Sequence, residues 1–140
     1  AGRFQKLFHK SPVILDGAHN PHALKALLDT LNQADASRPL HVVFSAIHTK
    51  DATQMVKLFE PAASSVHLCP SSVGKSLDQE ALKSISKDEY TYPHATAAFE
   101  EASRRAEQDQ GCVLVTGSPF LVADILHLIT GERRDPGVVS

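Results

Sequence analysis

The stretch VILDGAHNPHALKALL, residues 13–28, joins a short apolar run directly to an amphipathic helix. Residues 13–15 are apolar and end at Asp16, and Asn20-Pro21 supplies a favourable N-cap and first helical residue. The leucines that follow have the i, i+3, i+4, i+7 spacing typical of one helix face: Leu24, Leu27, Leu28 and Leu31. The stretch predicts a strand that passes into a helix, with a carboxylate, an imidazole and an amide at the junction.

The same order of apolar run, loop and helix-period segment is found five times along the chain. The later runs begin at His41, Ser65, Glu89 and Gly111, and the one at Glu89 is the weakest. Runs such as 113–115 do not alternate apolar with polar residues, so both faces of these strands must be covered, as in a parallel sheet between helices. The alternation predicts an α/β fold: a Rossmann-like open, mainly parallel sheet with helices on both faces.

The two ends of the chain differ from this pattern. Residues 4–9 form a further strand-like segment, and the turn at residues 10–12 is too short for a parallel crossover, which predicts an antiparallel N-terminal edge strand. Gly131 precedes a charged segment and Pro136, which predicts a domain over residues 1–131 and a tail over residues 132–140. The abrupt start in a strand suggests a piece of a longer protein.

Composition excludes several classes of partner. The formal net charge of −2 gives no electrostatic reason to expect nucleic acid or an anionic membrane as a partner. The sequence has no apolar run of about 18 residues, and AGRFQKLFHK at the N-terminus lacks the apolar core of a signal peptide. Cys69 and Cys112 each lie in an apolar run, which predicts buried thiols in a reducing compartment, with the cytoplasm as the expected location.

In an open α/β sheet, ligands bind beyond the carboxyl ends of the strands. Asp16, Lys50 and Ser118 all follow predicted strands, so they fall at this edge. A carboxylate at the end of a buried strand must find donors or a ligand, and Asp16 is suited to accept ribose hydroxyls while the adjoining helix start favours an anion. The simpler interpretations are that Lys50 is a solvated surface lysine and that Ser118 caps a helix.

Two further patterns compete for a function. Asp16, His19 and His22 are spaced as a conceivable metal set, although no further spaced ligand supports it. CPSSVGKS, residues 69–76, would be a phosphate loop if Cys69 were glycine. Without that glycine, Gly74-Lys75-Ser76 is better interpreted as a turn and a helix N-cap.

The combination of GRF at residue 2, ILDGAHNPHA at residue 14 and VTGS at residue 115 resembles the C-terminal domain of folylpolyglutamate synthase and dihydrofolate synthase, members of the Mur ligase superfamily. The resemblance covers Gly2 to about Gly131, and DGAHNP at a strand end is specific to the folate branch. It implies an ATP-dependent ligase that forms an acyl phosphate, which the amino group of glutamate then attacks.

The resemblance also implies roles for individual residues. Arg3 and Asp16 would contact ATP, while His19, Ser118 and Lys50 would hold the incoming L-glutamate; no catalytic residue and no metal ligand would belong to this domain. The phosphate loop, the sites for Mg²⁺ and most of the folate or dihydropteroate site would lie in an N-terminal ATPase domain that this chain lacks. Pro119 departs from the leucine and aromatic that usually follow the serine.

Three functions therefore compete. The leading one is the glutamate ligase domain, inactive when isolated. The alternatives are a stand-alone nucleotide- or phosphate-binding module that uses the GKS loop, and a small metal-dependent hydrolase built on Asp16, His19 and His22.

Overall fold

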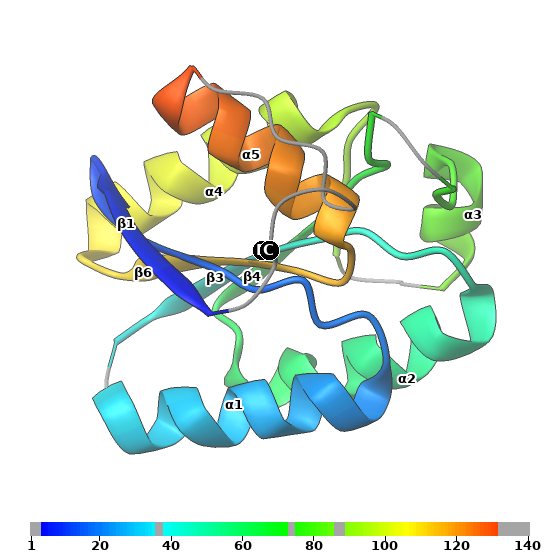
Figure 1. Ribbon diagram of the computed structural model, residues 1–140, viewed down its shortest axis with the longest axis horizontal. Helices are drawn as coiled ribbons and strands as arrows, with labels where there is room; N and C mark the ends of the chain where they lie inside the picture. Colours follow the sequence, from blue (N-terminus) through cyan, green and yellow to red (C-terminus); the bar gives the residue numbers. More distant parts are fainter. Residues whose placement is uncertain (1–3, 36–37, 73–74, 86–88, 132–140) are drawn as a thin grey trace.

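A computed structural model of the protein describes residues 4–35, 38–72, 75–85 and 89–131 (Figure 1). It contains a single six-stranded sheet in the order β1-β2-β6-β3-β4-β5. The strands have the following bounds: β1 Gln5–His9, β2 Ser11–Leu15, β3 Leu40–Phe44, β4 Ser65–Leu68, β5 Tyr90–Thr91 and β6 Cys112–Thr116. β1 pairs with β2 in antiparallel fashion and every other pair is parallel, which confirms the predicted sheet and its antiparallel N-terminal edge strand.

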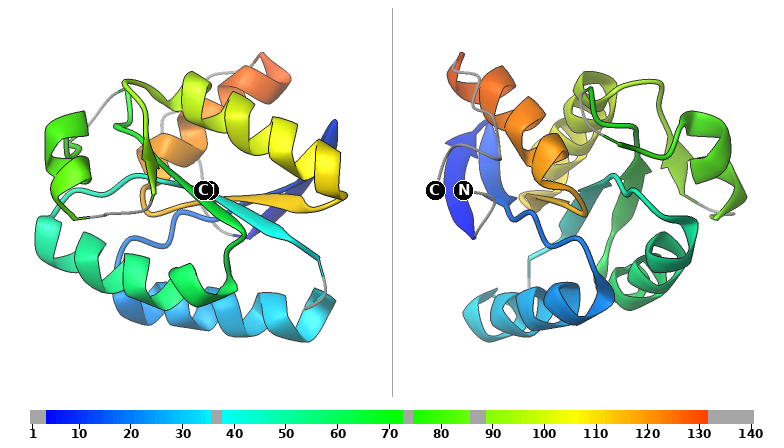
Figure 2. Two further views of the ribbon diagram at one scale, coloured as in Figure 1. Left: turned by 180° about the vertical axis from the view of Figure 1, so that it is seen from behind. Right: turned by 45° about the vertical axis from the view of Figure 1, so that its right-hand side comes forward.

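Helices cover both faces of the sheet, as the continuous apolar strands require (Figures 1 and 2). The helices have the following bounds: α1 Pro21–Asp35, α2 Thr49–Phe59, the 3₁₀ turn η1 Glu60–Ala62, α3 Gln79–Ser84, α4 Ala95–Asp109 and α5 Pro119–Thr130. α1 and α2 lie on one face and α4 and α5 on the other. None of these described helices is long and apolar enough to cross a bilayer.

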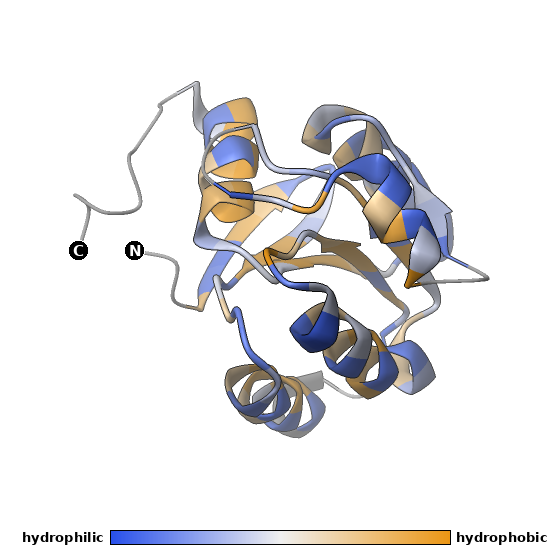
Figure 3. Ribbon diagram, turned by 90° about the vertical axis from the view of Figure 1, so that its right-hand side faces the viewer, coloured by the Kyte–Doolittle hydropathy of each residue, from blue (hydrophilic) through white to orange (hydrophobic). Residues whose placement is uncertain are grey.

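The core consists of two apolar clusters separated by the sheet, because successive strand residues point to opposite faces. Ile14, Val42 and Leu114 pack with α1 and α2 on one face. Val13 and Val43 pack with α4 and α5 on the other. Figure 3 shows apolar residues concentrated on the strands and on the helix faces turned toward them. Burial of this kind stabilises the fold by roughly 25 cal/mol for each Å² of apolar surface removed from water.

Both cysteine thiols are buried, as the sequence predicts, and neither forms a disulfide. Burial, and secondarily the charge of Asp124, raises the pKa of the Cys69 thiol to about 12. That thiol is therefore a packing group at neutral pH, because the thiolate is the reactive form.

The third and fourth strand–helix units are shorter than their sequence patterns indicate. α3 has six residues and begins at Gln79, so Leu77, whose spacing from Ala81 and Leu82 is helical in the sequence, lies before the helix. β5 has only two residues, Tyr90 and Thr91, and occupies the edge of the sheet. An edge strand needs partners on one side only, which is consistent with the weak sequence signal in this segment.

Candidate functional site at the carboxyl edge of the sheet

The loops that follow β2, β6 and β3 are held together by backbone hydrogen bonds. The Gly117 amide donates to the Ala18 carbonyl over 2.9 Å, and the Asp16 amide donates to the Val115 carbonyl over 3.0 Å. The Ser45 amide donates to the Thr116 carbonyl over 3.4 Å. The loops containing Asp16 and His19 are therefore adjacent to the loop containing Ser118 at one edge of the sheet.

Gly117 suits this junction because a side chain there would crowd the end of the neighbouring strand. Its φ of +101° lies in the left-handed region, and a Cβ at this position would lie 2.0 Å from the Ser45 carbonyl oxygen. The absence of a side chain lets three strand ends approach one another.

Asp16 lies half-buried where β2 ends. Its Oδ1 accepts a hydrogen bond from the Ala18 amide at 2.9 Å. Burial raises the pKa of the Asp16 carboxyl, and the Ala18 hydrogen bond only partly offsets this effect. The fold therefore keeps a carboxylate in a place where its charged form is disfavoured, which is typical of functional groups.

The start of α1 follows the predicted capping pattern. The Asn20 Oδ1 accepts a hydrogen bond from the Ala23 amide at 2.8 Å, and Pro21 is the first helical residue. His19 is exposed beside this cap, and His22 is exposed on the helix itself. The capping interaction accounts for Asn20 and leaves the His19 imidazole accessible to a ligand.

Ser118 is the N-cap of α5 and is 1% exposed. Its Oγ accepts hydrogen bonds from the Phe120 amide at 3.1 Å and the Leu121 amide at 3.4 Å. Pro119 occupies the first helical position, which suits its fixed φ, so its departure from the family pattern leaves the helix start intact. Capping uses the acceptor sites of the Ser118 hydroxyl, and its proton remains available for donation.

Lys50 is exposed in the first turn of α2, beyond the carboxyl end of β3. The N-cap residue of α2, His48, makes no side-chain capping bond. The first amides of α2 and the Lys50 ammonium therefore both favour an anion at this point. Arg3, the remaining predicted site residue, lies outside the described residues.

The loop after β4 corrects one prediction. Asp78, and not Ser76, caps α3, and its side chain accepts a hydrogen bond from the Ala81 amide at 2.9 Å. Ser76 instead closes the loop by accepting a hydrogen bond from the Ser71 amide at 3.0 Å and lying 3.2 Å from the Ser45 hydroxyl. The predicted cap was wrong because serine and aspartate are equivalent caps by sequence and the helix begins two residues later.

Asp124 on α5 is a residue that sequence reasoning missed. The residue is 9% exposed, and its carboxylate accepts hydrogen bonds from the Ser72 amide, at 2.8 Å, and from the Ser72 hydroxyl. Fifty-two residues separate the two partners, so no local pattern could reveal the pair. Asp124 anchors the loop after β4 to the helix that begins at the candidate site.

The metal alternative receives no support from the geometry. Within the described ranges, no three His, Cys, Asp or Glu side chains are grouped so that they could hold a metal ion. Asp16, His19 and His22, the set suggested by spacing, are all described and do not form such a group.

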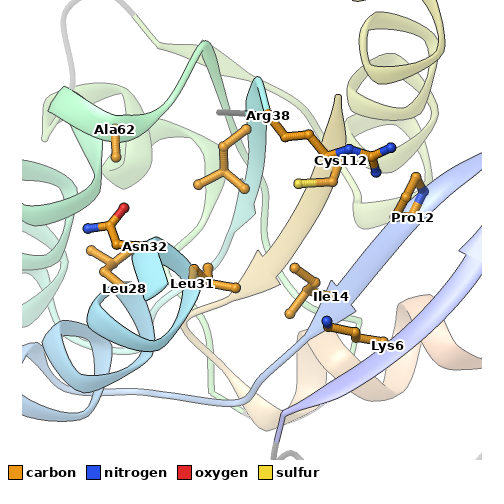
Figure 4. Close-up of a pocket in the computed structure, with 10 residues that line it drawn as sticks. Lys6, Pro12, Ile14, Leu28, Leu31, Asn32, Arg38, Ala62 and Cys112 are labelled. Atoms are coloured by element: carbon orange, nitrogen blue, oxygen red, sulfur yellow. The ribbon is translucent and has the colours of Figure 1, made fainter. Parts of the chain in front are cut away.

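A cavity of about 420 Å³ lies away from this edge, between α1 and the sheet (Figure 4). Its lining is mainly apolar and includes two cations: Lys6, Pro12, Ile14, Leu28, Leu31, Asn32, Arg38, Leu40, Ala62 and Cys112. Pro12, Leu40 and Cys112 mark the amino-terminal ends of β2, β3 and β6. The cavity is therefore distinct from the strand-end site, and it contains none of the predicted site residues.

Residues 2–119 match the family described as "Mur ligase, glutamate ligase domain". A probable bifunctional folylpolyglutamate synthase/dihydropteroate synthase from Haloferax volcanii is 36% identical over 88% of this chain and 15% of its own length. The dihydrofolate synthase/folylpolyglutamate synthase of Bacillus subtilis is 32% identical over 89% of this chain and 29% of its own. The chain thus spans less than a third of these relatives.

Solved structures with the same fold include enzymes of this group. Folylpolyglutamate synthase from Mycobacterium tuberculosis, complexed with ADP and AMPPCP, has a TM-score of 0.84 at 23% identity, covering 95% of this chain and 33% of that one. Escherichia coli FolC in complex with DHPP and ADP has a TM-score of 0.82 at 25% identity, covering 93% of this chain and 31% of that one. With a family match over most of its length and a sheet of the same architecture, the chain belongs to the glutamate ligase domain family of the Mur ligases, in the branch that contains the folylpolyglutamate and dihydrofolate synthases.

Proposed function

We propose that this chain is the glutamate ligase domain of an ATP-dependent enzyme that adds glutamate to folate or dihydropteroate. The observation that supports this most strongly is the joining of the Asp16, His19 and Ser118 loops at one edge of a sheet that belongs to this family. This chain spans less than a third of the length of these relatives, and the proposal assigns the remaining parts of the reaction to an ATPase domain of a parent enzyme.

The proposed reaction joins a carboxylate to an amine. ATP transfers its γ-phosphoryl group to the substrate carboxylate, the glutamate amino group attacks the resulting acyl phosphate, and phosphate leaves as the amide forms. Mg²⁺, held mainly by the ATPase domain, would neutralise the phosphates during transfer. This domain has two tasks in that scheme: it contacts ATP, and it positions glutamate for attack.

Asp16 is suited to the nucleotide. Its carboxylate lies half-buried at a strand end, where it can accept hydrogen bonds from ribose hydroxyls. A ligand that donates to this carboxylate replaces the solvation that burial removes, which favours binding. Arg3 is proposed to contact the phosphates.

Glutamate presents two carboxylates, which need cations or amide donors. His19 and Lys50 are exposed at the same edge of the sheet, and each lies beside the N-terminus of a helix. Ser118 is buried as a cap, so its proposed role is to hold the backbone of residues 117–118 in place and to donate its hydroxyl proton. A lysine ammonium, an imidazole and helix N-termini at one edge of the sheet are suited to a dicarboxylate.

The phosphate-loop alternative is weakened by the loop itself. In a working phosphate loop, the backbone amides point at the phosphates. Here the Ser72 amide is already occupied by the Asp124 carboxylate, which also places a negative charge where phosphate would bind. Residues 73–74 of this loop lie outside the described residues.

Steady-state kinetics of the parent ligase would test the assignment. Asp16→Ala is expected to raise KM for ATP, while His19→Ala, Lys50→Ala and Ser118→Ala raise KM for glutamate. Loss of one charge-assisted hydrogen bond costs about 1.5–3 kcal/mol, or about ten- to a hundred-fold. Unchanged glutamate dependence in the His19, Lys50 and Ser118 variants would remove these residues from the site.

Matched controls are available on α1 and α2. His22→Ala removes an exposed histidine one turn along from His19, and Lys57→Ala removes an exposed lysine from the far end of α2. Both variants should retain the KM values of the unmodified enzyme.

For the isolated chain, we expect a cooperative thermal melt and no release of ADP from ATP with Mg²⁺, glutamate and a folate acceptor. Turnover of ATP by the isolated chain would revive the phosphate-loop alternative.

A further inference from the structure

Five polar side chains form a continuous hydrogen-bonded chain beneath α4, away from the strand-end site. The Asp109 Oδ2 lies 2.7 Å from the His41 Nε2, and the His41 Nδ1 lies 2.6 Å from the Ser65 Oγ. The Ser65 Oγ lies 2.7 Å from the His67 Nε2, and the His67 Nδ1 lies 2.8 Å from the Tyr92 hydroxyl. All four contacts are within hydrogen-bonding distance.

Strand register creates this arrangement. His41 on β3 is paired with Ser65 on β4, and His67 follows two residues later on the same face of β4. His41, Ser65 and His67 are 3%, 8% and 0% exposed, whereas the Asp109 side chain is 39% exposed. A buried row of three polar side chains thus connects Asp109, at the end of α4, with Tyr92, just beyond β5.

The direction of every hydrogen bond follows from Asp109. A carboxylate only accepts, so the His41 Nε2 must carry a proton and, in a neutral ring, its Nδ1 must accept. The Ser65 hydroxyl therefore donates to His41, which requires Ser65 to accept from a protonated His67 Nε2. The His67 Nδ1 then accepts from the Tyr92 hydroxyl, so both histidines have the same tautomer.

We propose that this row of five hydrogen-bonded side chains is a one-proton switch. Uptake of one proton exchanges donor and acceptor in each hydrogen bond between Tyr92 and His41, and it leaves a positive charge on His41 next to the Asp109 carboxylate. Water supplies a proton to the Tyr92 oxygen, and Tyr92 passes its own proton to the His67 Nδ1. The His67 Nε2 proton moves to Ser65, and the Ser65 hydroxyl proton moves to the His41 Nδ1. Tyr92, His67 and Ser65 all end neutral.

The surroundings determine which histidine holds the charge. His67 faces Arg105 and Glu101 on α4, the ring of Tyr90 on β5, Tyr92 and His41. Burial, followed by the positive charges of Arg105 and His41, lowers the pKa of His67 to about 4, although Glu101 acts in the opposite direction. His41 has the Asp109 carboxylate as a direct partner, so a cation is better accommodated there.

The switch would act on the segment that leads into α4. Tyr92 changes from donor to acceptor, and its hydroxyl proton turns away from His67. Tyr92 stands two residues before His94, whose side chain caps α4 by accepting a hydrogen bond from the Ala97 amide at 3.3 Å. The protonation state of the hydrogen-bonded side chains beneath α4 is thereby coupled to the conformation of the loop at the carboxyl end of β5.

Nitrogen NMR of the histidine rings in the 140-residue chain tests this directly. At neutral pH, His41 and His67 should both carry the proton on Nε2 and not on Nδ1. On acidification, His41 should become doubly protonated, and at the same midpoint the His67 proton should shift from Nε2 to Nδ1 while that ring stays neutral. A change of tautomer without a change of charge distinguishes the switch from ordinary titration.

Two serine variants separate the switch from a packing role. In Ser65→Ala, His41 should still titrate but the His67 tautomer should no longer follow it. In Ser103→Ala, which removes a buried hydroxyl of α4 that has no hydrogen-bond partner among the described residues, both rings should respond as in the unmodified chain.

The titration of the unmodified chain alone can overturn the proposal. A proton on Nδ1 of either ring at neutral pH would do so, as would a His67 ring that becomes cationic or keeps Nε2 protonated while His41 titrates. Unfolding before His41 takes up a proton would also overturn it, because the folded state would then never switch.

Discussion

Asp16 illustrates how a proposed ligand-binding residue can oppose stability. Its folded-state pKa is raised, mainly by burial, above the ordinary value of 3.8. The folded state therefore binds a proton more readily than the unfolded state. The stabilisation from that protonation is complete at pH values below 3.8 and is lost as the pH rises through the folded-state pKa. At neutral pH, the ionised carboxylate destabilises the domain.

We therefore expect Asp16→Asn to raise the melting temperature of the isolated chain at pH 7. The asparagine Oδ1 can still accept the hydrogen bond from the Ala18 amide, so only the charge is lost. The difference from the unmodified chain should vanish near pH 3, where the aspartate is protonated. Asp29→Asn, which removes an exposed carboxylate from α1, should show no such gain; a lower melting temperature for Asp16→Asn at pH 7 would contradict the argument.

Comparison of Gly117 with Gly131 would measure how much stability is lost when a side chain is added at a crowded glycine. Both have positive φ, but a Cβ on Gly117 would lie 2.0 Å from the Ser45 carbonyl oxygen, whereas a Cβ on Gly131 would meet nothing within 4 Å. Gly131→Ala should lower the free energy of unfolding only by the cost of the left-handed conformation, about 1–2 kcal/mol. Gly117→Ala must also separate two strand ends, so we expect the free energy of unfolding, measured with urea, to fall by roughly 3 kcal/mol or more. Equal losses would show that the strand ends yield easily.

At the level of residues, the sequence predicted those features that depend on near neighbours. The caps at Asn20 and Ser118 each follow from a few adjacent residues. The Asp124 anchor and the Asp109–Tyr92 chain did not emerge, because their partners are far apart in sequence and meet only through tertiary packing.

At the level of elements, long periodic segments were predicted well and short ones poorly. α1 and α5 have 15 and 12 residues, and their sequences show a clear apolar stripe, whereas α4 has 15 residues but belongs to the unit with the weakest pattern. α3 and β5 are short, so local propensity determines little and packing determines their limits. The position of β6 between β2 and β3 depends on long-range pairing, which periodicity does not report.

The loop after β4 depends on an element distant in sequence, which makes its order testable. Asp124→Ala should increase hydrogen exchange at the Ser72 amide by about tenfold or more, because a hydrogen bond to a charged group contributes about 1.5–3 kcal/mol. Asp124→Asn retains an acceptor and should produce a smaller increase.

Asp78→Ala is the matched control for this measurement. It removes the α3 cap and should accelerate exchange at Ala81 while leaving Ser72 unchanged. If Ser72 exchanges at the same rate in the Asp124→Ala variant as in the unmodified chain, Asp124 does not anchor the loop in solution.

For the whole molecule, burial of His67 links global stability to pH. The pKa of His67 is about 4 in the folded protein and 6.5 when unperturbed, with burial as the main cause of the shift. Between these values, the unfolded chain binds more protons than the folded one, so the free energy of unfolding rises with pH. This contribution is complete above pH 6.5 and is lost as the pH falls through the folded-state pKa. Because His67 lies in the core that α4 shares with the sheet, loss of this stabilising contribution at low pH destabilises the whole domain.

We expect the unmodified chain to lose up to about 3 kcal/mol more stability between pH 6.5 and pH 4 than His67→Gln does. Glutamine does not titrate, yet its amide can donate to Ser65 and accept from Tyr92, so the hydrogen bonds of the neutral His67 ring are retained. Urea unfolding at a series of pH values provides the measurement, since carboxylate titration is common to both proteins and cancels in the difference. His127→Gln, an exposed change on α5, should retain the pH dependence of the unmodified chain. Parallel stability curves for the unmodified chain and His67→Gln would mean that His67 accepts a proton in the folded state as readily as in the unfolded state.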